Sequence, residues 1–168
     1  MVYWVDIFTR NRYCNIIIDS LNHCVEERGL DIFSYVIMSN HIHLLARSSK
    51  DDLSEIIRDF KRHTSRHIVN SIRYEPESRR EWMLKLFKHA ASQHERNQDY
   101  QLWTHDNHPV EIYSPEFTFQ RINYIHQNPV RAGIVDEPHE YRYSSARDYS
   151  GNPGLVKVEV LNLHLLKS

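Results

Sequence analysis

The sequence is poor in cysteine and has no long apolar run, and each scarcity excludes a class of protein. Its two cysteines, Cys14 and Cys24, lack the CxxC spacing of zinc and redox sites, so we expect them to be packing residues in a reducing compartment. No stretch approaches the roughly 18 apolar residues of a membrane-spanning helix, and the chain begins with charges where a signal peptide is apolar. We therefore predict a cytoplasmic protein without a membrane partner.

The sequence also lacks an excess of positive charge, since its net charge is −1. A chain without a strong positive field can bind nucleic acid only through a local patch. A length of 168 residues, of which 40% are hydrophobic, is enough for one domain with a buried core. We expect a single domain over residues 1–168, with a C-terminal tail from about residue 141.

Apolar residues spaced three or four positions apart predict four helices. Gly29 follows the first helix, where a C-terminus favours left-handed backbone, and Ser114 and Pro115 are typical of a helix start. Pro129 is expected to end the last helix at Asn128, because proline has no N–H and disfavours helical geometry in the residue before it. The predicted helices cover residues 15–28, 53–72, 78–93 and 115–128.

Two runs rich in β-branched and aromatic residues predict a β-hairpin over residues 31–38 and 41–47. Ser39 and Asn40 lie between the two runs and are common turn residues. Because side chains alternate along a strand, His41 and His43 should share one face of the second strand. A further short strand is expected over residues 110–113.

The His-Ile-His triplet of His41 and His43 is a candidate metal site. Two neutral imidazoles on one face of a strand can hold one divalent ion. Twelve histidines in 168 residues would produce about one such triplet by chance, so the triplet alone favours ordinary hydrogen-bonded strand residues. Two other pairs are rival metal ligands of weaker standing, His63 with His67 on a helix and His105 with His108 in a turn-forming segment.

The segment YIHQNPVRAGIV places a tyrosine and a side-chain amide one helical turn apart, at Tyr124 and Asn128. Cleavage of a phosphodiester needs a nucleophile aimed at phosphorus and a cation that neutralises the charge growing on the phosphate. Tyr124 could supply the nucleophile, and a metal on His41 and His43 could supply the charge. An amide oxygen would complete the metal site, from Asn128 or, as second choice, from Gln127.

Basic residues follow one side of the predicted helix at residues 53–72. Between Ile56 and Arg73, Asp59 is the single acidic residue. Such a stripe can run along a phosphate backbone, but a solvated helix face explains the same charges equally well. The basic residues of the stripe are Arg58, Lys61, Arg62, Arg66 and Arg73.

Four segments taken together resemble the single-tyrosine HUH transposase family: SYVIMSNHIHLL, LWTHDNHPVEIYS, YIHQNPVRAGIV and YRYSSARDY. The likeness points particularly to the transposase-like proteins linked to repetitive extragenic palindromes, and it covers nearly the whole chain. That family pairs a His-hydrophobic-His strand with a later helix that bears a tyrosine and an amide ligand. The resemblance implies an α+β domain with a central antiparallel sheet and helices packed on it, of the ferredoxin-like HUH type.

The resemblance also implies an activity. The implied substrate is single-stranded DNA folded into hairpins, which Tyr124 would cut to form a 5′-phosphotyrosine and a free 3′-hydroxyl. The implied cofactor is Mg²⁺ or Mn²⁺, held by His41, His43 and Asn128. Family members occur as dimers and as monomers, so a homodimer is an open expectation. The implied DNA contacts are Arg58, Lys61, Arg62, Arg66 and Arg131.

One feature departs from the family. Relatives usually carry a β-strand before the segment that matches residues 3–10, and here the chain begins at Met1. We therefore expect a sheet without its first strand, which would leave unpaired ladder groups. Two other functions stay open: a non-catalytic nucleic-acid-binding module that keeps the basic helix, and a metal-dependent hydrolase that uses water in place of Tyr124.

Overall fold

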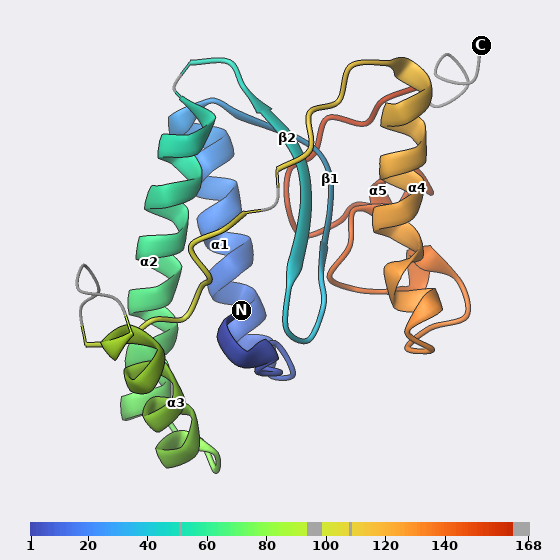
Figure 1. Ribbon diagram of the computed structural model, residues 1–168. Helices are drawn as coiled ribbons and strands as arrows, with labels where there is room; N and C mark the ends of the chain where they lie inside the picture. The colour runs from blue at the N-terminus through green and yellow to red at the C-terminus, as the bar shows by residue number, and fades with distance from the viewer. Residues whose placement is uncertain (51, 94–98, 108, 163–168) are drawn as a thin grey trace.

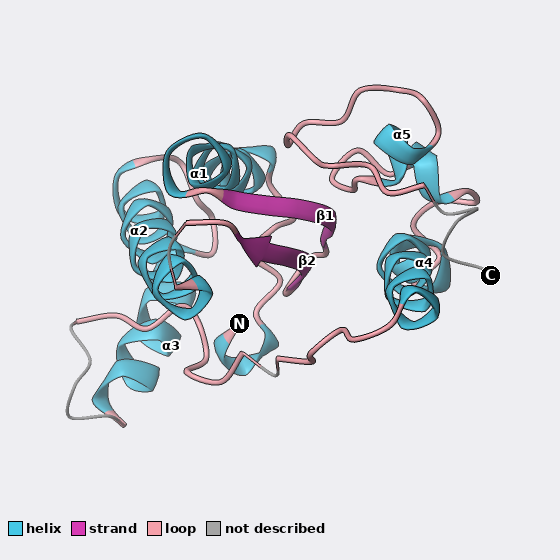
Figure 2. Ribbon diagram, turned by 90° about the horizontal axis from the view of Figure 1, so that it is seen from above, coloured by secondary structure: helices cyan, strands magenta, loops and turns pink. Residues whose placement is uncertain are grey.

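A two-stranded antiparallel sheet lies between two groups of helices. The computed structural model describes the 168 residues except 51, 94–98, 108 and 163–168. Helices α1 and α2 lie on one side of the sheet, and α4 and α5 lie on the other (Figure 1, Figure 2). This arrangement confirms the predicted α+β class with an antiparallel sheet, which has two strands in the described part of the chain. The elements are η1 (Val2–Trp4), α1 (Asn11–Arg28), β1 (Leu30–Ile37), β2 (Ile42–Ser48), α2 (Leu53–Tyr74), α3 (Arg80–Ser92), α4 (Pro115–Arg131), η2 (Pro138–Glu140) and α5 (Ala146–Tyr149).

The hairpin forms where the sequence predicts it. β1 and β2 pair antiparallel, with Val36 opposite His43. The Met38 N–H donates to the His41 carbonyl at 2.9 Å, which closes the predicted two-residue turn. Gly29 has a φ of 67°, so it ends α1 in the left-handed backbone that favours glycine.

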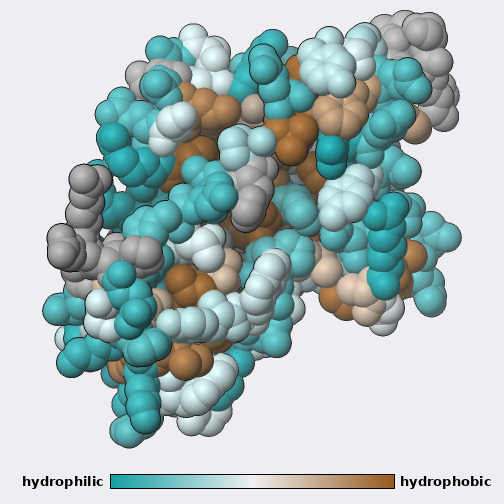
Figure 3. Space-filling view, viewed as in Figure 1, coloured by the Kyte–Doolittle hydropathy of each residue, from teal (hydrophilic) through white to brown (hydrophobic). Residues whose placement is uncertain are grey.

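Alternate residues of β1 pack toward different helices. Tyr35 and Ile37 belong to the main core together with Ile17 of α1, whereas Val36 packs in a second cluster with Ile125 of α4. On the face seen in Figure 3, hydrophobic residues are visible in the middle of the molecule, between the α2 side and the α4 side. The sheet therefore holds α4 against the face opposite to α1, where side chains of α4 can meet those of β2.

The short strand predicted over residues 110–113 does not form. The described residues 109–113 have no regular structure, and Val110 and Tyr113 are 55% and 84% exposed. Composition favoured a strand, but β-propensity mostly reflects packing on a half-buried sheet, and an extended segment needs a hydrogen-bonded neighbour. The two described strands do not pair with this segment, so its residues connect α3 to α4 as a loop.

The last predicted helix is longer than expected. α4 continues through Pro129 to Arg131 and does not end at Asn128. A proline removes one hydrogen bond from a helix interior, but Pro129 is buried and its carbonyl accepts a bond from the Ile134 N–H at 2.9 Å. Gly133 follows with a φ of 66°. Packing at this end of α4 therefore outweighs the local cost of the proline.

The segment expected as a C-terminal tail packs along the outer edge of β1. The Ile37 N–H donates to the Tyr143 carbonyl at 2.9 Å, and the Ser145 N–H donates to the Tyr35 carbonyl at 3.1 Å. These bonds satisfy backbone groups that an edge strand would leave unpaired. The segment therefore contributes to the fold, and its residues 163–168 lie outside the described part of the chain.

A buried carboxylate ties the loop before α3 to α1. The side chain of Glu77 is 0% exposed and accepts a hydrogen bond from the Tyr13 hydroxyl at 2.9 Å. It pairs with Arg10 at 2.8 Å, Arg12 at 3.3 Å and Arg79 at 3.4 Å. Burial by itself would raise the pKa of Glu77, but the Arg79 backbone N–H, the Tyr13 hydroxyl and the arginines lower it to about 2. The carboxylate is therefore ionised and held among three guanidinium groups.

We expect Glu77→Gln to lower the free energy of unfolding by about 3 kcal/mol, because it leaves the arginines without their common counter-ion. Urea denaturation measures the loss. Glu75→Gln is the control, since Glu75 pairs with Arg12 at 3.5 Å from an exposed position and should cost below about 0.5 kcal/mol. The depressed pKa means that the Glu77 contribution is present above about pH 4.5 and is lost as the pH falls toward 2. Equal costs for the two variants would contradict this role.

Candidate active site

The hairpin brings the two histidines of the triplet together. The ring centroids of His41 and His43 lie 4.9 Å apart, and the rings are nearly perpendicular, at 80°. His41 lies directly before β2 and His43 is the second residue of β2, so both side chains leave the same face of the hairpin. The predicted sharing of a face is confirmed.

Helix α4 places Tyr124 beside this pair. The ring centroid of Tyr124 lies 5.4 Å from that of His43, although the two residues are far apart in the sequence. The guanidinium of Arg131 lies 5.2 Å from the centroid of the Tyr124 ring. Tyr124 is 37% exposed, so a ligand can reach its side chain. Packing of α4 on the sheet therefore brings together the predicted nucleophile, both histidines and one predicted DNA contact.

Both histidines are held in the neutral form that a metal ligand requires. Burial, and then the charge of the chain N-terminus, lowers the pKa of His41. Burial, and then the charges of His41 and Arg121, lowers the pKa of His43 to about 4. Nδ1 of His41 lies 2.7 Å from Oδ1 of Asn40, an acceptor, so Nδ1 carries the proton and Nε2 is left with its lone pair. The pair is therefore ready to coordinate a cation at neutral pH.

Asn128, which the sequence analysis predicts as the third ligand, lies on α4 together with Tyr124. It lies one turn beyond Tyr124, and its side-chain N–H donates to the Tyr124 carbonyl at 2.8 Å. This bond leaves the amide oxygen as an acceptor. The part of the chain that the structure describes holds no metal-binding group of three or more His, Cys, Asp and Glu residues, so a third ligand here would be another kind of oxygen donor. Two neutral imidazoles and one amide oxygen fit a divalent ion.

Comparison with known proteins assigns a family to the chain. The family model described as "Transposase IS200 like" matches residues 3–114. The chain belongs to the IS200-like transposase family. The matched part includes His41 and His43 and ends directly before α4, so Tyr124 lies outside it. No curated protein and no solved structure matches the sequence.

Because the chain belongs to the IS200-like transposase family, its partner is DNA and its type of reaction is cleavage of nucleic acid. Transposases of this family generally use divalent metals, which agrees with the donor set at His41 and His43. Among the helices of the described residues, none has the length and apolar character that crossing a bilayer requires.

A residue that the sequence analysis did not single out anchors α4 of this IS200-like protein. His126 is buried, with Nε2 at 3.1 Å from the Ser34 hydroxyl and 2.9 Å from the Ser145 hydroxyl. The Ser145 hydroxyl also accepts the Tyr35 N–H at 2.9 Å, and the His126 ring contacts that of Tyr149. These partners come from β1 and from the C-terminal segment, so no local pattern could reveal them. The network fixes the rotation of α4 and with it the position of Tyr124.

We expect protonation of His126 to destabilise the protein. Burial lowers the pKa of His126 from 6.5 to about 4. The folded state binds fewer protons than the unfolded state between these values, so the free energy of unfolding falls as the pH drops from 6.5 toward 4, by up to about 3 kcal/mol. His126→Gln should flatten part of this decline in urea titrations at successive pH values. An unchanged slope in the variant would contradict the assignment.

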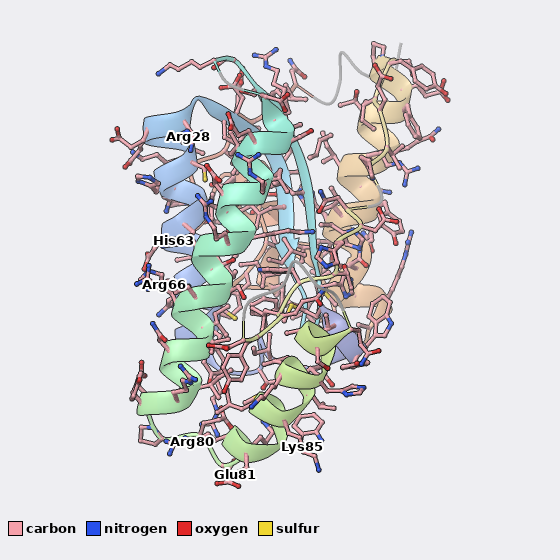
Figure 4. All side chains as sticks on the ribbon, turned by 60° about the vertical axis from the view of Figure 1, so that its left-hand side comes forward. Arg28, His63, Arg66, Arg80, Glu81 and Lys85 are labelled. Carbon is pink, nitrogen blue, oxygen red and sulfur yellow. The ribbon has the colours of Figure 1, made fainter. Side chains whose placement is uncertain are left out.

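The rival pair of His63 and His67 lies elsewhere on the IS200-like fold. The ring centroids of His63 and His67 lie 4.2 Å apart on α2, and His63 and Arg66 project from α2 on the side away from the sheet (Figure 4). Over the described residues no third histidine, cysteine or acid joins them as a metal group. His105 lies in the loop before α4, and His108 lies outside the described residues.

The basic stripe of α2 is partly neutralised by acidic side chains, and Glu55 of α2 pairs with Arg58 at 2.8 Å. Asp59 pairs with Arg28 at 3.3 Å, Arg58 at 3.6 Å and Arg62 at 3.0 Å. Lys61 is half-buried and its ammonium group donates to a loop carbonyl at 2.8 Å. The stripe therefore carries less uncompensated charge than its sequence suggests, and its contact with DNA remains a proposal.

Proposed function

We propose that the protein cuts and rejoins single-stranded DNA hairpins through Tyr124. One observation carries the proposal: α4 sets the Tyr124 ring 5.4 Å from that of His43. The family match supports DNA as the substrate and covers both histidines. The hairpin form of the DNA follows from the resemblance of the sequence to single-tyrosine HUH transposases.

The reaction exchanges one phosphate ester for another. The Tyr124 oxygen attacks phosphorus, the bond to the 3′ oxygen breaks, and the phenol proton passes to that oxygen, which gives a 5′-phosphotyrosine and a 3′-hydroxyl. Because phenolate is a good leaving group, attack by a 3′-hydroxyl reverses the step and rejoins DNA without an energy cofactor. A Mg²⁺ or Mn²⁺ ion held by His41, His43 and Asn128 would neutralise charge on the phosphate.

Several side chains support this reaction through their protonation state and their orientation. Burial keeps the two imidazoles neutral, and Asn40 orients the His41 ring through Nδ1. The Arg131 guanidinium lies 5.2 Å from the Tyr124 ring centroid, so it is close enough to the nucleophile to be a contact for the attacked phosphate.

Covalent capture of DNA tests the proposed function. The unaltered protein is incubated with a pooled library of single-stranded hairpins in Mn²⁺ or Mg²⁺ and analysed on a denaturing gel. We expect a protein–DNA adduct that EDTA prevents. Adduct formation in EDTA would contradict the role of the metal, and cut DNA without an adduct would indicate the hydrolase that uses water. Salt-sensitive binding without cutting, unaffected by EDTA, would indicate a binding module.

A further inference from the structure

The aromatic rings of the candidate site continue beyond His41 to the N-terminal segment. The indole of Trp4 lies edge-on to the His41 ring, with 6.2 Å between their centroids. Trp4, His41, His43 and Tyr124 therefore form one row of neighbouring rings. The row ends at the guanidinium of Arg131, over the Tyr124 ring. Its other end, Trp4, is 70% exposed.

The backbone of Trp4 is fastened to the same turn that carries His41. The Asn40 side-chain N–H donates to the Trp4 carbonyl at 3.4 Å, while Oδ1 of Asn40 faces Nδ1 of His41 at 2.7 Å. Asp6 accepts bonds from both turn residues, from Ser39 at 2.6 Å and from Asn40 at 3.2 Å. Figure 1 shows η1 beside the tip of the hairpin. Trp4 therefore has a defined position relative to the histidines.

Trp4 is also held in an unfavourable backbone conformation. Tyr3 and Trp4 have φ values of 52° and 53°, a region that bulky side chains rarely adopt. Single exposed apolar residues are common on protein surfaces and need no explanation. Trp4 differs from such residues, because its exposed indole is held in left-handed backbone beside a candidate active site. Backbone strain of this kind persists only where surrounding contacts impose it, and it is concentrated at ligand sites.

We propose that Trp4 is a base-stacking platform, on which an unpaired base of single-stranded DNA stacks while the adjoining phosphate lies at His41 and His43. The inference rests on the proposed function, which puts the cleaved phosphate at His41 and His43. Every base has a π face, so this contact tolerates any sequence but requires a nucleotide that is not paired. The substrate is therefore a hairpin with a single-stranded flank at the cleavage position, and a fully paired duplex is a poor ligand.

The test measures equilibrium binding in a Tyr124→Phe background, so that no covalent step interferes. The probe is a DNA hairpin with a short single-stranded flank that carries 2-aminopurine, titrated with protein in Mn²⁺. Trp4→Ala is expected to weaken binding by about 5- to 100-fold and to remove quenching of the probe, and Trp4→Phe is expected to restore most of both. Trp82→Ala is the matched control, because Trp82 is 51% exposed on α3. It should change the affinity less than about two-fold.

Several results would overturn the inference. One is an affinity of Trp4→Ala for the probe within about two-fold of the parent, and another is an equal loss of affinity in Trp82→Ala. A third is that Trp4→Ala loses as much affinity for a blunt hairpin without a flank. A fourth is that the parent does not bind DNA. Circular dichroism and the recovery in Trp4→Phe separate loss of stacking from loss of folding. Failure of the proposed function looks different: no adduct forms with Tyr124 present, while the Trp4 effect on binding persists. A second copy of the chain as the occupant would appear as Trp4-dependent association without DNA.

Discussion

Tyr124→Phe should abolish covalent capture of DNA and leave the affinity for the hairpin within about two-fold. The substitution removes the hydroxyl oxygen alone, so the ring can keep its place 5.4 Å from His43 and 5.2 Å from the Arg131 guanidinium. Binding through the phosphate backbone does not need that oxygen. Loss of the nucleophile should reduce adduct formation by more than about 1,000-fold. A denaturing gel quantifies the adduct, and a filter-binding titration measures affinity.

Tyr113→Phe is the matched control for this experiment. Tyr113 is 84% exposed, two residues before α4, and stacks on Phe117 at 5.5 Å between centroids. Its ring packs on Phe117 of α4 and not on a histidine ring, so the same loss of one hydroxyl should leave capture unchanged. Full capture by Tyr124→Phe would show that another group attacks the phosphate. Cut DNA that carries no protein and is insensitive to Tyr124→Phe would identify water as the nucleophile.

Replacing His41 or His43 with alanine should remove most of the metal-dependent activity. Each substitution deletes one of two imidazole ligands from a site with few other donors, and loss of a ligand leaves the phosphate charge uncompensated. We expect capture at saturating DNA to fall by about 100-fold or more. Titration of Mn²⁺ against capture should show an apparent affinity weakened in both variants.

His63→Ala and His67→Ala provide the control pair. Their rings are also close together, at 4.2 Å, but they lie on α2, a different helix from that of Tyr124. Capture should stay unchanged in both variants. If capture were lost in these variants but kept in His43→Ala, the metal site would lie on α2.

Low pH should have the same effect as loss of a ligand, because protonation of His43 as the pH approaches about 4 removes its lone pair.

The sequence predicts the elements whose signals are local. The hairpin, the start of α4 and the left-handed Gly29 all depend on neighbouring residues, and each is confirmed. Errors occur where tertiary contacts decide. Residues 110–113 have the composition of a strand without a strand beside them, and Pro129 continues α4 because its burial offsets the missing hydrogen bond.

The same division holds for the site. Strand periodicity was enough to place His41 and His43 on one face, and helical spacing was enough to place Asn128 one turn from Tyr124. The docking of α4 onto β2 depends on packing over the whole sheet, and the His126 network depends on partners from two distant segments. Neither leaves a pattern in the sequence. The position of Trp4 could not be predicted from the sequence either, because it depends on the packing of η1 against the turn of the hairpin.

Peptide mapping of the adduct tests the central claim most directly, because it needs no substitution. The adduct formed by the unaltered protein is treated with nuclease, digested with trypsin and analysed by mass spectrometry. Trypsin cuts after Arg121 and Arg131, so the peptide at residues 122–131 contains Tyr124 as its single tyrosine. The account predicts a nucleotide 5′-phosphate on Tyr124 in that peptide. A nucleotide on any other residue, or none on this peptide in a sample that contains adduct, would contradict it.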